Sequence, residues 1–172
     1  NANVGDTGTI SGTLYTVVDN TSIHTEVDAG NINLCTTKVT RMLFLFQDNT
    51  SFNSDIGFWD TSNVKNMVAM FSNATSFNQN IGNWDTSNVI DMNSMFGFAE
   101  AFDQPIVNWD TSSVTNMENM FLEASSFDQN LSNWCVSNIS SEPGNFAEYS
   151  ALTNVNKPLW GKEFTISLTS GS

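Results

Sequence analysis

The hydrophobic positions of this chain recur at a fixed interval of 25 residues. The segment GNWDTSNVIDMNSMF, which begins at Gly82, has the counterpart GFWDTSNVKNMVAMF 25 residues earlier and VNWDTSSVTNMENMF 25 residues later. Degenerate copies begin at Leu34 and Trp134. An active site needs its special residues once, whereas a stacked scaffold needs them in every layer. The period therefore predicts an α/β solenoid of about five stacked repeats.

Each repeat is predicted to contain a short strand, a turn and a short helix. From Met67 onward the apolar positions follow the spacing i, i+3, i+4, i+7 and i+10, which is typical of a helical stripe of about three turns. The strand is expected either near Gln79–Trp84 or over Thr86–Val89, because periodicity alone does not separate the two. One repeat of this size cannot bury its apolar face alone, so stacked repeats would share one continuous core.

The core is predicted to consist of files of equivalent residues, one residue per repeat. These files are Val39, Val64, Val89, Val114 and Ile139; Met42, Met67, Met92 and Met117; Phe46, Phe71, Phe96 and Phe121; Ala74, Ala99 and Ala124; and Phe52, Phe77, Phe102 and Phe127. The tryptophans that open the repeats, Trp59 to Trp134, are expected in the core or at its edge. An exposed tryptophan row that binds ligands by stacking is the alternative.

The two ends of the chain depart from the repeat and are predicted to be caps. Residues 1–33 alternate in polarity and then become helix-like, which predicts a hairpin followed by a short helix that ends at Gly30. The repeat region is expected to span residues 34–158, and residues 159–172 would form a C-terminal cap or tail. The last segment, KEFTISLTSGS, is either an edge strand or a loose tail. Caps of this kind protect the exposed ends of a stacked core.

The repeat FNQNIGNWDTSNVIDMNSMF resembles those of the BspA-like leucine-rich-repeat surface proteins, of the type known from mycoplasma lipoproteins. The resemblance extends from about Leu34 to Trp160. It implies a right-handed, leucine-rich-repeat-like solenoid on an exported protein, with a role in adhesion or protein–protein contact and no catalytic motif. The chain departs from the pattern where Leu34 replaces tryptophan, Cys35 and Cys135 replace aspartate, and Pro105 enters the third loop.

The charge balance excludes some partners. The chain has 18 acidic and 5 basic residues, for a net charge of −13. This argues against binding to nucleic acid or to an anionic membrane surface, because both need clustered Lys and Arg. No apolar stretch approaches the ~18 residues that a membrane-spanning helix needs. A composition rich in Asn, Ser, Thr and Phe indicates an extracellular or cell-surface protein.

The aspartates after the tryptophans form the first candidate site. Asp60, Asp85 and Asp110 would stack about 5 Å apart, where two exposed carboxylates repel by roughly 0.8 kcal/mol in water. Bridging Ca²⁺ would relieve this repulsion, because the ion takes 6–8 oxygen ligands. The alternative is that each carboxylate accepts backbone N–H groups in an Asx turn. No other cofactor is expected.

The same register predicts the state of the two cysteines. Cys35 and Cys135 are four repeats apart, which corresponds to about 19 Å at ~4.8 Å per repeat. A disulfide needs Cα atoms within about 7 Å. The cysteines are therefore expected to be free thiols buried at the caps, or partners in intermolecular bonds.

Two further files bear on function. Thr36, Thr61, Thr86 and Thr111 could form a flat array that orders water or ice. In another register, Lys65, Ile90 and Thr115 differ from repeat to repeat, as recognition positions do, and are the candidate partner-binding residues.

The expected function is therefore non-enzymatic binding of a protein or glycan on a cell or matrix surface. The chain has a single histidine and no hydrolase, metalloprotease or P-loop motif. The alternatives are a structural spacer within a larger surface protein and a Ca²⁺-dependent or ice-binding module. The sequence predicts no particular oligomeric state.

Overall fold

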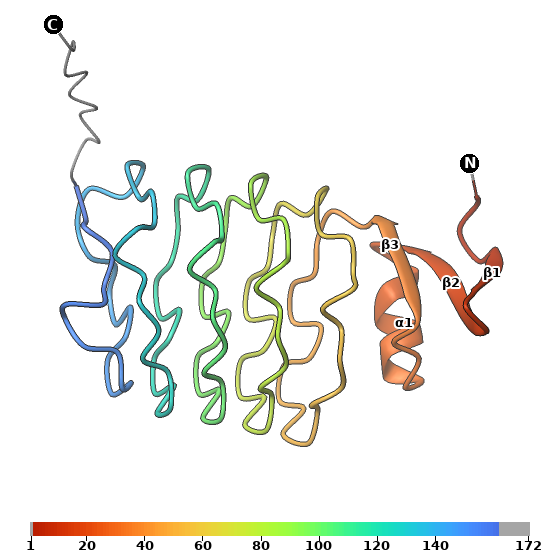
Figure 1. The fold of residues 1–172 in the computed structure, drawn as a ribbon, viewed down its shortest axis with the longest axis horizontal. Helices are drawn as coiled ribbons and strands as arrows, with labels where there is room; N and C mark the ends of the chain where they lie inside the picture. The colour runs from red at the N-terminus through yellow and green to blue at the C-terminus, as the bar shows by residue number, and fades with distance from the viewer. Residues whose placement is uncertain (1, 162–172) are drawn as a thin grey trace, which may run out of the picture.

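The described part of the computed structural model, residues 2–161, begins with a small three-stranded sheet (Figure 1). Its strands are β1 (Thr7–Ile10), β2 (Thr13–Asp19) and β3 (Leu34–Lys38), in the order β1-β2-β3. β1 pairs antiparallel with β2, and β2 pairs parallel with β3. Helix α1 (Ser22–Asp28) connects β2 to β3. A hairpin and a short helix are expected in this segment, and the structure has β1, β2 and α1 there.

Helix α1 is short, and side-chain hydrogen bonds hold its N-terminal end. The Oδ1 atom of Asp19 accepts hydrogen bonds from the backbone N–H groups of Thr21 and Ser22, each at 3.0 Å. These bonds satisfy N–H groups that have no partner within the first turn of a helix. The side chain of Ile23 is fully buried, so the helix covers the first part of the core.

Beyond β3 the 25-residue repeats lie side by side along one axis (Figure 1). We number them repeat 1 (34–58), repeat 2 (59–83), repeat 3 (84–108), repeat 4 (109–133) and repeat 5 (134–158). Adjacent repeats are joined by backbone hydrogen bonds between equivalent positions. The N–H of Ile90, for example, donates to the C=O of Lys65 at 2.9 Å. Isolated parallel bridges join Arg41, Asn66, Asp91 and Asn116.

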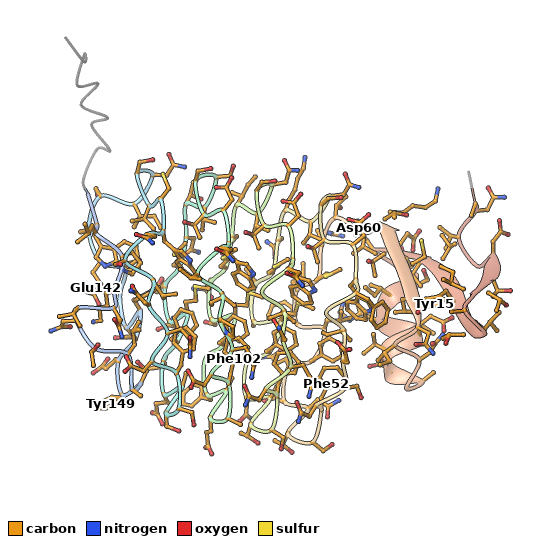
Figure 2. The ribbon with its side chains drawn as sticks, viewed as in Figure 1. Tyr15, Phe52, Asp60, Phe102, Glu142 and Tyr149 are labelled. Atoms are coloured by element: carbon orange, nitrogen blue, oxygen red, sulfur yellow. The ribbon has the colours of Figure 1, made fainter. Side chains whose placement is uncertain are left out.

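The core runs through the repeats without interruption, and it contains the predicted files. The equivalent valines, methionines and most phenylalanines are fully buried, whereas Phe52 at the N-terminal end is only partly buried. Phe96 stacks on Phe71 and Phe121 in the neighbouring repeats, with ring centroids 5.6 Å apart in both cases. It also stacks on Phe102 of its own repeat at 4.0 Å, and the Phe102 side chain lies inside the stack (Figure 2). These predictions of core residues are confirmed.

The structure has turns where the sequence predicts a short helix in each repeat. Ala69 and Asn73 have φ values of 50° and 59°, and Ser94 and Phe98 repeat this pattern at 54° and 59°. A right-handed helix requires φ near −60° at every residue, so no helix can run through these positions. Consecutive turns, each closed by a hydrogen bond between residues three positions apart, therefore produce the apolar spacing of three and four residues.

The hydrogen bonds of these segments show the same arrangement. The N–H of Met70 donates to the C=O of Met67 at 3.2 Å, which closes a turn within the repeat. The N–H of Phe71 donates to the C=O of Met95 in the next repeat at 2.9 Å. The backbone thus alternates between local turns and bonds to its neighbour, whereas a helix would use its N–H groups internally.

Neither range expected to hold the strand is assigned as one within residues 2–161. Gln79–Trp84 and Thr86–Val89 contain turns and irregular backbone, and the parallel bridges lie after the repeat valine, at Asn66 and Asp91. No helix among the described residues is long and apolar enough to cross a membrane. The strand or tail expected at KEFTISLTSGS, residues 162–172, lies outside the described residues.

Candidate functional site

The aspartate file lies on the surface, and its carboxylates are engaged in local turns. The Oδ1 atom of Asp85 accepts the Ser87 N–H at 3.0 Å and the Ser87 hydroxyl at 2.6 Å. Asp60 repeats both bonds with Ser62 at 3.0 and 2.6 Å, and Asp110 accepts the Ser112 N–H at 2.9 Å. This is the geometry of an Asx turn.

The same carboxylates do not assemble into a cation site. Within residues 2–161, no three His, Cys, Asp or Glu side chains come together in an arrangement that could hold a metal ion. Ca²⁺ needs six to eight oxygen ligands, and the Oδ1 atoms of Asp60, Asp85 and Asp110 already accept hydrogen bonds from their own turns. The geometry thus favours the turn role of this file over the bridging role.

The turn at Asp85 makes a prediction about pH. Hydrogen bonds from the Ser87 hydroxyl and then from the Ser87 N–H hold the pKa of Asp85 below its ordinary value. A lowered pKa stabilises the fold above the unfolded-state pKa of about 3.9, and this contribution is lost as the pH falls through the folded-state pKa. In a carboxyl NMR titration, Ser87→Ala should raise the pKa of Asp85. An unchanged pKa in the variant would contradict the hydroxyl's role.

The threonine file is buried and does not face solvent. The side chains of Thr36, Thr61, Thr86 and Thr111 are each 1% exposed. Each hydroxyl donates to a carbonyl of the following repeat at 2.8–2.9 Å; the acceptors are the C=O groups of Asp60, Asp85, Asp110 and Cys135. The exposed array on which ice binding would depend is therefore absent at this file, because its hydroxyls serve as bonds between repeats.

The tryptophan file makes the complementary bonds in the opposite direction. The four side chains are 1–4% exposed, so an exposed row that stacks ligands is excluded for this file. The Nε1 atoms of Trp84 and Trp109 donate to the C=O groups of Ile56 and Ile81, each 28 residues earlier in the chain, at 3.2 and 3.1 Å. In each Trp-Asp-Thr sequence, the tryptophan therefore donates to a carbonyl earlier in the chain, and the threonine donates to a carbonyl in the following repeat.

Removing one threonine hydroxyl should destabilise the stack. Thr86→Val keeps the shape of the side chain but leaves the C=O of Asp110 without this donor, and an unsatisfied buried acceptor costs about 1–3 kcal/mol. The change should appear in urea unfolding monitored by tryptophan fluorescence. Thr115→Val is the matched control, because Thr115 is exposed and its loss should cost less than about 0.5 kcal/mol. Equal losses in the two variants would contradict the role assigned to the buried hydroxyl.

The candidate partner-binding residues form one continuous exposed row, which we call the variable row. Lys65, Ile90 and Thr115 all face solvent, and 47% of the Ile90 side chain is exposed. Their backbones are joined directly, since the N–H of Ile90 donates to Lys65 and the N–H of Thr115 donates to Ile90, each at 2.9 Å. The structure thus places a cation, an apolar side chain and a hydroxyl side by side.

The two cysteines occupy the aspartate register and share its surface position. Both are free, and both are partly exposed, which differs from the expected burial at the caps. The Sγ atom of Cys35 lies 3.6 Å from the Thr37 hydroxyl, and that of Cys135 lies 4.0 Å from the Ser137 hydroxyl. The thiols face outward because the register alternates: the buried residue directly after each cysteine is Thr36 or Val136.

A groove between repeats 4 and 5 was not predicted from the sequence. Its volume is about 330 Å³, and Thr115 at the end of the variable row belongs to its lining. The sequence does carry a signal for it: Ser141 stands where repeats 2 to 4 have Asn or Asp, and Pro143 follows two residues later. We call this hollow the inter-repeat groove.

Comparisons with known proteins identify one family. A family model described as "Mycoplasma protein of unknown function, DUF285" matches residues 19–105 and residues 40–160. The two matches together span α1, β3 and all five repeats, and β1 and most of β2 precede them. No curated protein matches the chain. No solved structure matches it.

Proposed function

The chain belongs to the DUF285 family of Mycoplasma-type repeat proteins, whose function is unknown, and we propose that this member has a binding role. The proposed protein is a non-enzymatic, exported or cell-surface solenoid that binds a protein or glycan on a cell or matrix surface. Its architecture would be the right-handed, leucine-rich-repeat-like stack of the BspA-like proteins that its repeats resemble. The variable row is the observation that carries this proposal.

The variable row combines a constant backbone with changing side chains. Hydrogen bonds of 2.8–2.9 Å hold the N–H groups of Lys65, Ile90 and Thr115 in equivalent positions. The side chains at these positions differ in charge, size and polarity, whereas the core files beneath them keep the same residue types. Variation on a rigid, exposed scaffold is the usual arrangement of a recognition surface.

The stacking of the repeats supports the proposed architecture. The aromatic files continue from repeat to repeat, with Phe71, Phe96 and Phe121 spaced by 5.6 Å, and each repeat bonds both of its neighbours. A stack that contacts only neighbouring units is the defining property of a solenoid. Export is supported by the composition and by the resemblance to surface proteins. The engagement of the aspartates in turns favours a scaffold over an enzyme.

Substitutions in the variable row test the proposal. Binding of the fluorescently labelled 172-residue protein to a glycan array and to immobilised extracellular-matrix proteins would identify a ligand. Lys65→Ala and Ile90→Ala should then weaken that binding by roughly tenfold each, the loss expected for an interface hot spot. Val107→Ala is the control, because Val107 is a similar apolar side chain, 36% exposed, outside the row. Unchanged binding by both folded variants would favour a structural spacer.

A further inference from the structure

The inter-repeat groove marks a local break in the backbone ladder between neighbouring repeats. Between repeats 2 and 3 the ladder contains two bonds: the Ile90 N–H donates to Lys65 at 2.9 Å, and the Met67 N–H donates to Asp91 at 3.0 Å. The same pair of bonds joins repeats 1 and 2, and also repeats 3 and 4. Between repeats 4 and 5 it is missing among residues 2–161.

Among residues 2–161, the break leaves one backbone donor and one backbone acceptor without partners. At the equivalent sequence positions of repeat 5, the Ser140 N–H should donate to the C=O of Thr115. The C=O of Ser141 should accept from the N–H of Met117. Within the described residues neither bond forms, and Met117 is fully buried. Buried backbone groups are nearly always paired, so an unpaired N–H at the wall of a groove indicates a missing partner.

The amino-acid sequence explains why the ladder breaks at this point. In repeats 2 to 4 an Asn or Asp side chain closes the corner: Asn66, Asp91 and Asn116 accept the N–H two residues ahead at 3.0–3.1 Å. In repeat 5 Ser141 stands at the sequence position of this corner residue, and from Pro143 onward the backbone runs one residue out of register. The Phe146 N–H donates to the C=O of Pro143, as the Met70 N–H donates to that of Met67 in repeat 2.

The break is confined to this corner. The ladder resumes, one residue out of register, where the Asn119 N–H donates to the C=O of Gly144 at 3.0 Å; the equivalent Ser94 N–H donates to Glu118. Gly161 approaches Ser140 so closely that a Cβ there would lie 2.3 Å from the Ser140 oxygen. The end of the described chain therefore packs against the same corner.

We propose that the inter-repeat groove binds an extended peptide that carries a basic residue. The peptide would restore the ladder, with one N–H donating to Thr115 and the C=O of the following residue accepting from Met117. A dipeptide offers these two groups at the required spacing, as Lys65–Asn66 and Ile90–Asp91 do in the intact interfaces. Addition of a peptide strand to unpaired backbone is an established mode of recognition.

The charges around the groove favour a basic peptide. Glu118 lines the groove and makes no ion pair within the described residues, whereas Glu142 is held by Lys157 at 2.7 Å. The chain as a whole carries a net charge of −13. This inference rests on the proposed function, because Thr115 belongs both to the groove and to the variable row. The inference specifies a basic peptide as the class of partner for that row.

The test uses a peptide whose sequence is taken from the chain itself. The probe is the capped peptide Asn-Val-Lys-Asn-Met, which copies residues 63–67. The control is the same peptide with a methyl group on the backbone nitrogen of its lysine. Titration of the ¹⁵N-labelled protein with the probe should shift the NMR signal of the Met117 amide. N-methylation removes one backbone hydrogen bond and should therefore weaken binding about tenfold. Equal binding of both peptides, or no shift at Met117, would overturn the proposal.

Two variants test the groove itself. Glu118→Gln should weaken binding of the probe several-fold, whereas Glu123→Gln, an exposed acidic residue outside the lining, should not. Ser141→Asn with Pro143→Val copies the closed corner of repeat 2 and should abolish probe binding. In free protein the Met117 amide should exchange its hydrogen faster than the Met92 amide, and closure should remove that difference. Equal protection of the two amides in the unmodified protein would overturn the proposal.

The two proposals fail in different experiments. Loss of surface binding in Ile90→Ala, together with full binding in the closed-corner variant, would retain the variable row and reject the groove as its peptide site. Probe binding at Met117 together with unchanged surface binding in Lys65→Ala and Ile90→Ala would retain the groove and reject the variable row. N-acetylglucosamine serves as a further probe, and displacement of the peptide by this sugar would indicate a saccharide site instead.

Discussion

Phe96→Ala is expected to lower the free energy of unfolding by about 3–5 kcal/mol, the usual cost of removing a buried phenylalanine. The Phe96 side chain is fully buried and stacks on four rings: Phe71, Phe102 and Phe121 at 4.0–5.6 Å, and Trp109 at 6.1 Å. Its removal would open a cavity between three consecutive repeats. Urea unfolding followed by circular dichroism measures the loss.

The control for this prediction is a phenylalanine in the same repeat. Phe98 is 40% exposed, so Phe98→Ala removes less buried area than Phe96→Ala does. Its effect on the free energy of unfolding should be clearly smaller than that of Phe96→Ala. Hydrogen exchange should also show loosening of repeats 2 and 4 in Phe96→Ala, because each repeat depends on its neighbours. A small loss in Phe96→Ala would mean that the aromatic files contribute little to the core.

Gly82→Ala is expected to cost about 3 kcal/mol, near the upper end of the range for overpacking. A Cβ at Gly82 would lie 2.4 Å from the backbone oxygen of Pro105 in the next repeat. Real Cβ atoms do not approach an oxygen so closely, and a backbone obstacle cannot rotate away as a side chain can. The two repeats would have to separate at this point, and thermal unfolding would report the loss.

Gly8→Ala provides the comparison for this substitution. Gly8 lies in β1, and a Cβ there would meet nothing within 4 Å, so the change should be close to neutral. Val107 occupies the register of Gly82 one repeat later, which shows that the position tolerates a side chain where the spacing allows it. An unchanged melting temperature in Gly82→Ala would mean that the spacing between repeats 2 and 3 adapts to a methyl group.

The sequence predicted the residues of the core but not the backbone that carries them. The 25-residue period identified the buried files, and Met92 and Phe96 lie in the core as expected. The helical stripe was misread, because spacings of three and four residues arise both from a helix and from consecutive turns. The distinction depends on positive φ angles at residues such as Ala69 and Phe98, and these residue types give no signal for that conformation.

The candidate site was also only partly predictable. The position of the variable row on the surface follows from its polarity and its variation between repeats. The burial of Thr86 does not, because a threonine next to Asp85 and Ser87 looks like part of an exposed polar turn. Its orientation is set by the carbonyl that it bonds in the next repeat, which is a contact between residues 24 positions apart.

The opposed bonds of each Trp-Asp-Thr sequence restrict how the length of this protein can change. Insertion or loss of a few residues would shift Trp109 and Thr86 away from the carbonyls of Ile81 and Asp110 and leave those groups unpaired. Duplication or removal of a whole 25-residue unit would present an equivalent carbonyl at every junction. The stack can therefore lengthen or shorten only in whole units, each adding about 4.8 Å of reach, which makes its gene segment suited to growth by tandem duplication.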